Sequence, residues 1–150
     1  LPQPKFKSVQ LKDLIERVAQ LMKVELKNTG IELQYHCRPD TPPINADEEM
    51  IEQVLINLVK NSIEALSQMV GGKINLSLTH KDSFVIVDVT DNGSGIIPEA
   101  IERVFVPFFT TKKAGSGIGL ALSRQIMQLH NGTLTVKSEP YVKTVFRLKF

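Results

Sequence analysis

The sequence predicts an α+β fold in which one sheet and a layer of helices form a two-layer α/β sandwich. Two observations lead to this fold class. Three long segments carry apolar side chains at helical spacing, and the segments between them alternate apolar and polar residues as strands do. The chain has 150 residues, of which 42% are apolar and 23% charged, and this balance and length suit one hydrophobic core. We therefore expect a single domain over residues 1–150.

The first helix is expected near the N-terminus, where Ser8 can serve as its N-cap. Apolar residues recur at helical spacing after Ser8, and the pattern ends near Asn28–Gly30. Residues 31–37 are expected to form a short strand. The loop that follows is interrupted by prolines, namely Pro39, Pro42 and Pro43.

The longest predicted helix begins at Asp47 and continues to about Met69, where two glycines end it. Residues 73–80 and 84–90 then alternate apolar and polar side chains, so we expect them to pair as a hairpin. A short helix is expected to start at Pro98.

The third long helix is expected to start in the glycine-rich stretch 115–119 and to run to about His130. Asn131-Gly132 then favours a turn. Two final strands are expected over residues 133–138 and 142–150.

The long second helix carries two asparagines one turn apart. Its polar face consists of Gln53, Asn57, Lys60, Asn61 and Glu64. A solvated face explains the glutamine, lysine and glutamate, but asparagine is a poor helix former in the middle of a helix. Two carboxamides one turn apart can instead supply neutral oxygens to Mg²⁺, which takes few protein ligands and relies on substrate phosphates for the others. The helix alone leaves both interpretations open.

Asp91 follows the apolar face of the strand 84–90. Strand side chains alternate, so Asp91 continues the row of buried valines in that strand. A buried carboxylate needs a donor, because burying it unpaired is costly. Asp91 can bond the backbone of its own loop, as in an Asx-turn, or it can accept from a ligand such as the exocyclic amine of adenine. In the second case Gly93 and Gly95 would let the backbone approach the ring closely.

The stretch Gly115–Leu120 opens a helix, and Lys112 and Lys113 precede it. Free amide groups and the helix dipole make the N-terminus of a helix a suitable binding site for phosphate. A flexible loop with a purely structural role explains the glycines equally well. A Rossmann turn is disfavoured, because Leu120 stands where a small residue is required and no buried strand precedes the turn. The sequence also lacks a Walker A motif.

Four motifs occur in a distinctive order along the chain. They are Asn57-x-x-x-Asn61, Asp91-x-Gly93-x-Gly95-Ile96, Phe105-Val106-Pro107-Phe108-Phe109-Thr110-Thr111-Lys112 and Gly115-x-Gly117-x-Gly119-Leu120. The series resembles the asparagine, glycine and phenylalanine boxes of histidine-kinase catalytic domains, in the superfamily shared by DNA gyrase B, heat-shock chaperone ATPases and MutL proteins. The resemblance covers nearly the whole chain. It implies the Bergerat fold, a mixed five-stranded sheet backed by three helices, with ATP between the second helix and a mobile lid.

The resemblance implies roles for the matching residues in binding ATP and Mg²⁺. Asp91 would bond the adenine amine, and Thr144 would support it through water. Asn61 would be the chief Mg²⁺ ligand, with Asn57 near the phosphates and Lys112 as the third residue assigned to catalysis. The full nucleotide-binding set that it implies is Asn57, Asn61, Asp91, Gly93, Gly95, Ile96, Thr111, Lys112, Gly115, Ser116, Gly117, Ile118, Gly119, Leu120 and Thr144.

The chain departs from the family pattern at two places. In the ATP-hydrolysing relatives a water-activating glutamate stands where this chain has Asn57, which cannot act as a base, so phosphoryl transfer to an imidazole is favoured over hydrolysis. The second departure is Tyr141–Lys143, where the family usually has a glycine just before the residue that matches Thr144.

The phosphoacceptor histidine is expected elsewhere. None of the three histidines, His36, His80 and His130, stands in the family's His-Glu-x-x-x-Pro context. The chain also begins without Met, so we expect it to be part of a longer sensor kinase whose dimerising acceptor domain precedes Leu1 and which serves a response regulator. This fragment is expected to be monomeric and its parent homodimeric.

The composition limits which classes of partner and which cellular compartment are expected. The 18 basic and 16 acidic residues give a net charge of +2 with no basic stripe, so no nucleic-acid partner is expected. Cys37 is the only cysteine, and no apolar run approaches the roughly 20 residues of a membrane span. We expect a cytoplasmic domain, whether or not the parent is anchored in the inner membrane.

The alternative function is that of an ATPase or serine kinase of the same superfamily, or of a nucleotide sensor that transfers no phosphate.

Overall fold

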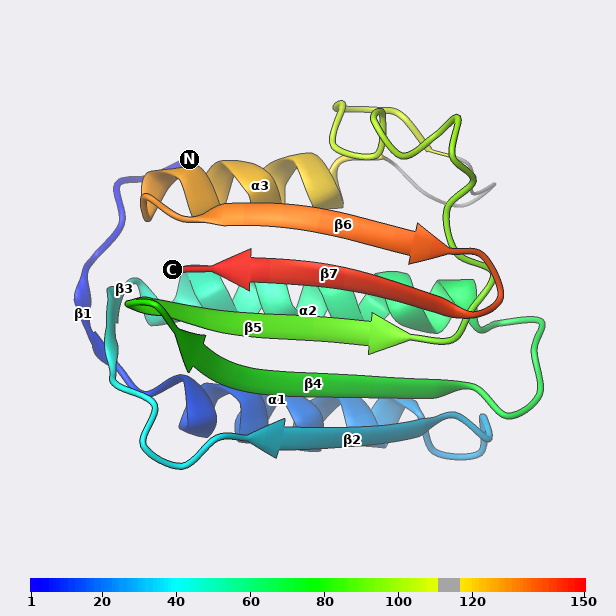
Figure 1. Ribbon diagram of the computed structural model, residues 1–150, viewed down its shortest axis with the longest axis horizontal. Helices are drawn as coiled ribbons and strands as arrows, with labels where there is room; N and C mark the ends of the chain where they lie inside the picture. The colour runs from blue at the N-terminus through cyan, green and yellow to red at the C-terminus, as the bar shows by residue number, and fades with distance from the viewer. Residues whose placement is uncertain (111–116) are drawn as a thin grey trace.

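The computed structural model describes residues 1–110 and 117–150. Three helices lie on one face of a five-stranded sheet, and a two-stranded sheet lies beside the start of the second helix (Figure 1). The helices are α1 (Leu11–Glu25), α2 (Glu48–Ala65) and α3 (Gly119–Leu129). The strands are β1 (Lys7–Val9), β2 (Glu32–Cys37), β3 (Ile44–Ala46), β4 (Lys73–Lys81), β5 (Phe84–Asp91), β6 (Thr133–Glu139) and β7 (Lys143–Lys149). The predicted two-layer α+β sandwich is therefore confirmed.

The large sheet is mixed, with the strand order β2-β4-β5-β7-β6. Strands β2 and β4 are parallel, whereas the other neighbouring pairs are antiparallel. Across the sheet α1 contacts β2 and β4, α2 contacts β4 and β5, and α3 contacts β6. The helices thus follow one another across the sheet in chain order, and each buries its apolar stripe on the strands beneath it.

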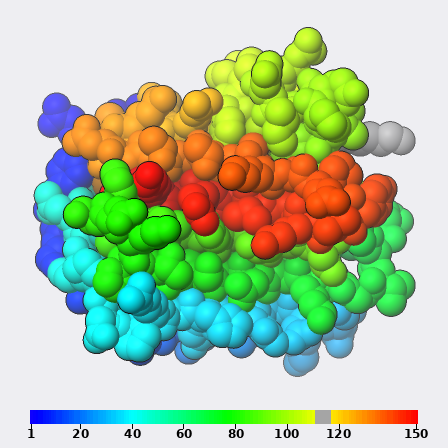
Figure 2. All heavy atoms as spheres, viewed as in Figure 1, coloured from blue at the N-terminus to red at the C-terminus, as the bar shows by residue number. Residues whose placement is uncertain are grey.

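The core lies between the helices and the sheet. Strand β5 shows the predicted alternation, with Val85, Val87 and Val89 buried and the residues between them half-buried. The opposite face of the sheet carries polar side chains and faces the viewer in Figure 2. On that face Arg147 of β7 forms two bonds with Asp88 of β5, at 2.8 and 2.9 Å, which raise the pKa of the arginine.

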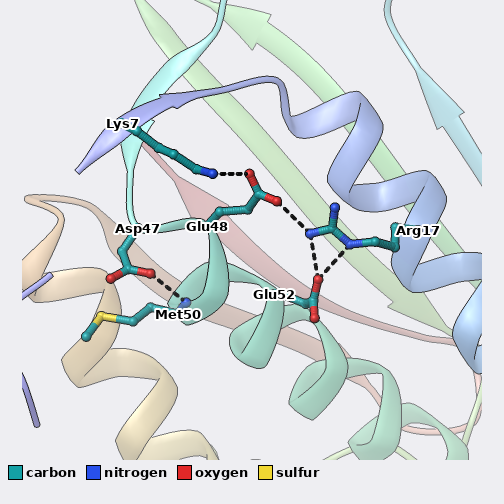
Figure 3. A network of polar contacts seen from close by, with 6 residues as sticks. All are labelled: Lys7, Arg17, Asp47, Glu48, Met50 and Glu52. Atoms are coloured by element: carbon teal, nitrogen blue, oxygen red, sulfur yellow. Dashed lines mark hydrogen bonds and ion pairs between the residues drawn. The ribbon is translucent and has the colours of Figure 1, made fainter. Parts of the chain in front are cut away.

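Asp47, where the longest helix was expected to begin, is the N-cap of α2. Its side chain accepts from the backbone N–H of Met50 at 3.1 Å, which satisfies one of the free amides of the first turn. An ion-pair network surrounds this turn, because Arg17 of α1 contacts both Glu48 and Glu52 while Lys7 of β1 contacts Glu48 (Figure 3). These contacts tie α1 and β1 to the start of α2.

Two expectations about local structure are wrong, and two short strands were missed. Ser8 does not cap α1, because it lies in β1 opposite Asn45 of β3, and the N-cap position is Gln10. The short strands β1 and β3 were not predicted, since three residues are too few to show a period. Residues 98–105 form successive turns rather than a helix from Pro98.

The segment 92–110 leaves the end of β5 and passes over the end of the molecule toward the start of α3 (Figures 1 and 2). Within the described residues, no helix is both long and apolar enough to cross a bilayer.

Candidate functional site

A cavity of about 460 Å³ opens between α2, the ends of β5 and β7, and the start of α3. Its walls contain nine of the fifteen residues expected to bind a nucleotide, together with ten residues that were not expected. The expected residues in its lining are Asn57, Asn61, Asp91, Gly95, Ile96, Gly117, Gly119, Leu120 and Thr144. Residues far apart in the sequence therefore meet at one place.

Thr144, whose assignment the sequence supported least, is one of these nine residues. Gly93 and Ile118 are not part of the lining. The backbone N–H of Gly93 is bonded to Asp91, and Ile118 occupies the exposed N-cap position of α3. The remaining expected residues lie outside the described part of the chain, and they are Thr111, Lys112, Gly115 and Ser116.

Asp91 is the last residue of β5 and is only 3% exposed. Its Oδ1 accepts from the N–H of Gly93 at 2.9 Å, so the Asx-type bond to its own loop is formed. Asp91 also lines the cavity, so the two interpretations of this carboxylate are compatible. One oxygen holds the loop, while the carboxylate as a whole provides a negative, acceptor-only group at the cavity wall.

Asn57 and Asn61 lie one turn apart on α2 and are both half-buried. The side-chain amide of Asn61 donates to the backbone carbonyl of Asn57 at 3.0 Å, and the amide of Asn57 donates to Oγ of Ser123 on α3 at 3.0 Å. A carbonyl can only accept, so the bond from Asn61 determines which end of its carboxamide is nitrogen. The oxygen of Asn61 is therefore on the other side of the group from Asn57 O.

Gly119 brings the start of α3 against Asn57. A methyl group in place of its hydrogen would overlap Oδ1 of Asn57 and come within 2.9 Å of the amide nitrogen. Glycine is therefore required here for a close approach of two helices, one of which begins at the cavity with backbone amides that have no partner within the helix. This arrangement suits an anion at the start of α3.

Thr144 is 3% exposed and lies directly opposite Asp91 in the pairing of β7 with β5. Its hydroxyl is bonded to Oγ of Ser138 on β6 at 2.8 Å. The absence of a glycine before Thr144 has not displaced it, because the register of β7 still places the threonine beside Asp91.

Sequence reasoning missed several residues of the site. The lining also includes Lys60, Glu64, Ala65, Ser94, Ile97, Ala100, Val104, Phe109, Thr110 and Phe146. Two of these, Lys60 and Glu64, belong to the polar face of α2, so that face was the available signal. Ser123 and Ser138 act behind the lining, and a single serine in α3 or β6 carries no signal in the sequence.

Across residues 1–110 and 117–150, no three His, Cys, Asp or Glu side chains are grouped so as to hold a metal ion. A cation here would depend on amide and ligand oxygens, which is the donor set that Mg²⁺ accepts. The Asn61 carboxamide, with its nitrogen bonded to Asn57 and its side chain in the lining, fits such a role.

Comparison with known proteins agrees with this geometry. Residues 46–150 match the family model described as histidine kinase-, DNA gyrase B-, and HSP90-like ATPase. Sporulation kinase A of Bacillus subtilis (strain 168) is 34% identical over 95% of this chain, which spans 23% of that relative. The catalytic domain of the histidine kinase ThkA superimposes with a TM-score of 0.87 and is 32% identical, covering 97% of this chain and 95% of that one.

A second structure of ThkA, in complex with the response regulator protein TrrA, has a TM-score of 0.83 and 30% identity over 98% of this chain and 42% of that chain. The chain thus spans less than half of the longer proteins that it matches here and nearly all of an isolated catalytic domain. The chain belongs to the family of histidine kinase-, DNA gyrase B-, and HSP90-like ATPases, and within it to the histidine-kinase catalytic domains.

Proposed function

We propose that residues 1–150 form a single domain that binds Mg-ATP in the cavity and presents the γ-phosphate to a histidine on a separate dimerisation domain. The observation that carries this proposal is that one buried carboxylate, Asp91, lines the same cavity as the paired carboxamides of Asn57 and Asn61 and the start of α3. Such a site offers one acceptor for a base and several neutral groups for a charged tail.

At the purine end, Asp91 accepts a hydrogen bond from the exocyclic amine of adenine. Its carboxylate is an acceptor only, so a base with a carbonyl at that position would be repelled. The hydroxyl of Thr144 lies beside the carboxylate and supports the base through water. The cavity is also lined by Ile96, Ala100 and Phe146, whose apolar surface suits the faces of a ring.

At the phosphate end, the amides of Gly117 to Leu120 and the positive end of the α3 dipole stabilise the phosphate oxygens. Asn61 is the protein ligand of Mg²⁺, and its bond to Asn57 O holds the carboxamide in place. When bound, Mg²⁺ neutralises charge that develops on the phosphates. From the family resemblance, Thr111, Lys112, Gly115 and Ser116 complete the lid and the cradle.

In the transfer, the bond between the γ-phosphorus and the bridging oxygen breaks, ADP keeps the electron pair, and an imidazole nitrogen forms the new bond to phosphorus. This chemistry asks the protein mainly for positioning and charge stabilisation. Asn57 has no basic atom to take a proton from water, which favours an imidazole acceptor over hydrolysis. The role of Asn57 is to hold the phosphates and the start of α3, to which it is bonded through Ser123.

The acceptor domain and the response regulator are partners of the longer parent protein, which we propose to be a homodimer, with this fragment monomeric by itself. Support comes from ThkA, whose structure in complex with the response regulator TrrA contains a similar domain. We propose a cytoplasmic location because ATP is supplied there, and the lone cysteine, Cys37, is compatible with a reducing compartment.

Two measurements test the proposal together. Calorimetry should detect binding of ATP and ADP by the fragment, with ATP binding strengthened by magnesium. Labelled Mg-ATP should then phosphorylate a supplied dimerisation domain at histidine, which is identified by an acid-labile product. A folded fragment that gives no heat with either nucleotide would refute the site. Rapid release of phosphate without any acceptor domain would instead support the hydrolytic alternative.

A further inference from the structure

Three side chains from three neighbouring strands lie in one row at the end of the sheet that borders the cavity. Asp91 of β5 pairs with Thr144 of β7, and Thr144 pairs with Ser138 of β6. Side chains of directly paired residues project to the same face of a sheet, so all three project toward the helices. Asp91 and Thr144 line the cavity, whereas Ser138 lies behind them and was not expected from the sequence.

Ser138 forms hydrogen bonds both with Thr144, its neighbour in this row, and with the loop that follows Asp91. Its Oγ accepts from the backbone N–H of Ile96 at 2.9 Å and is 2.8 Å from the hydroxyl of Thr144. A second bond joins the same two segments, because the N–H of Tyr141 donates to the carbonyl of Gly93 at 3.0 Å. The hairpin between β6 and β7 therefore holds the loop at two points.

The loop that follows Asp91 also packs directly against the hydroxyl of Ser138. Gly95 has a φ of +74°, and a methyl group there would lie 2.7 Å from Oγ of Ser138 and 2.8 Å from Cα of Pro140. No side chain fits between the loop and the hairpin at this point. Since Gly95 and Ile96 themselves line the cavity, the position of one wall depends on this contact.

The turn of the hairpin keeps this arrangement without a glycine. The N–H of Val142 donates to the carbonyl of Glu139 at 2.9 Å, with Pro140 and Tyr141 between them and Tyr141 at a φ of +63°. These are the features of a type II turn, in which the third residue has a positive φ. Tyr141 adopts this conformation although it is not glycine, and Ser138 and Thr144 remain paired.

We propose that Ser138 is a positioning residue for the purine end of the nucleotide site. It holds the wall formed by Gly95 and Ile96 and orients the hydroxyl of Thr144 beside Asp91, without touching the ligand. The proposal rests on the proposed function, since it assigns the base to the Asp91 end of the cavity.

The test compares Ser138→Ala with Ser138→Thr, which keeps the hydroxyl, and with Thr135→Ala, which removes an exposed hydroxyl from the same strand. Loss of the bonds should weaken binding of ADP without magnesium and of Mg-ATP by the same factor, about five- to tenfold, in Ser138→Ala. Ser138→Thr should bind within about twofold of the wild type, and Thr135→Ala should bind as the wild type does. Amide exchange at Ile96 should become faster only in Ser138→Ala.

The transfer kinetics separate positioning from a general structural defect. Ser138→Ala should raise the KM for ATP and leave kcat unchanged, because the phosphate end of the site is intact. Wild-type affinity in a folded Ser138→Ala protein would overturn the inference, as would an equal loss in Ser138→Thr, which would assign the effect to packing rather than to the hydroxyl. If the wild type itself bound no adenine nucleotide, the proposed function would fail first.

Discussion

Asn57 of α2 donates its side-chain amide to Oγ of Ser123 on α3 at 3.0 Å, so one bond joins the two helices that border the phosphate end of the cavity. Ser123 is buried, and the start of α3 approaches Asn57 so closely that only glycine fits at position 119. The distance between Asn61 and the amides at the start of α3 is set by this junction. The site therefore depends on helix packing as well as on its lining residues.

Gly119→Ala should disturb this junction. The added methyl group would overlap the Asn57 carboxamide, so we expect a loss of about 1–3 kcal/mol in the free energy of unfolding and weaker binding of Mg-ATP. Urea denaturation and calorimetry measure the two effects. Replacing Asn57 by Ala in the same protein should restore much of the stability, because it removes the overlapping atoms. Exposed Gln125→Ala on α3 is the control, and a Gly119→Ala protein of wild-type stability and affinity would contradict the close contact.

Asp91→Asn should strongly weaken nucleotide binding while leaving the fold intact. The asparagine oxygen can still accept from the N–H of Gly93, but the negative charge is gone and an amide nitrogen replaces one acceptor. A hydrogen bond to a charged group is worth about 1.5–3 kcal/mol, so the Kd for ADP should rise at least about tenfold. Calorimetry provides the Kd, and circular dichroism verifies the fold. Asp88→Asn, on the opposite face of β5, is the matched control. Unchanged ADP affinity in Asp91→Asn would rule out the adenine role.

Asn61→Ala should affect only reactions that need magnesium. The substitution removes the proposed metal ligand and leaves the purine end unchanged, so ADP binding without magnesium should stay at the wild-type level. Transfer of phosphate from Mg-ATP to a supplied acceptor domain should fall by at least about tenfold, as expected when a metal ligand is lost. Gln53→Ala, an exposed polar change on the same helix, should behave as the wild type. Normal transfer by Asn61→Ala would show that Asn61 does not hold the cation.

Asp47→Ala should destabilise the protein in a pH-dependent way. Loss of the N-cap bond to Met50 should lower the free energy of unfolding by about 0.5–2 kcal/mol at neutral pH. Hydrogen bonds from the backbone of Lys5 and then of Met50 lower the pKa of Asp47 below its ordinary value of 3.8. A lowered pKa means that the stabilising effect is complete above 3.8 and is lost as the pH falls through the pKa in the folded protein.

The stability difference between wild type and Asp47→Ala should therefore be constant above about pH 5 and narrow below the ordinary pKa of aspartate. Urea denaturation at neutral pH and in steps toward pH 3 measures this difference. Glu49→Ala, an exposed change in the same turn, should leave the wild-type pH dependence in place. A difference that grew on acidification would have the opposite sign to the one expected from the lowered pKa.

Much of the fold could be read from local patterns. The period of two in β5 placed Asp91 on the buried face, and the helical period of α2 placed Asn57 and Asn61 on one polar side, where the structure also has them. The start of the longest helix at Asp47 also agrees with the structure, where Asp47 is the N-cap of α2. These properties depend on neighbours a few residues away, so the sequence contains their signal directly.

Other features have no local signal. Ser8 has the residue type of a cap, but pairing with Asn45, which follows α1 and β2 in the chain, places it in β1 instead. Ser138 reaches Thr144 and Ile96 only because three strands pair in one register. Ser123 meets Asn57 only because α3 packs on α2. In each case a partner distant in the chain decided the role of the residue.

The sequence by itself determined the α+β class, the order of its long helices and strands, and the faces on which the carboxylate and the carboxamides lie. Only the tertiary structure decided that these faces enclose one cavity, and which serines stand behind its lining. The physical reason is that side-chain periodicity specifies an orientation within one element, whereas a site requires the relative position of several elements, which follows from strand register and helix packing.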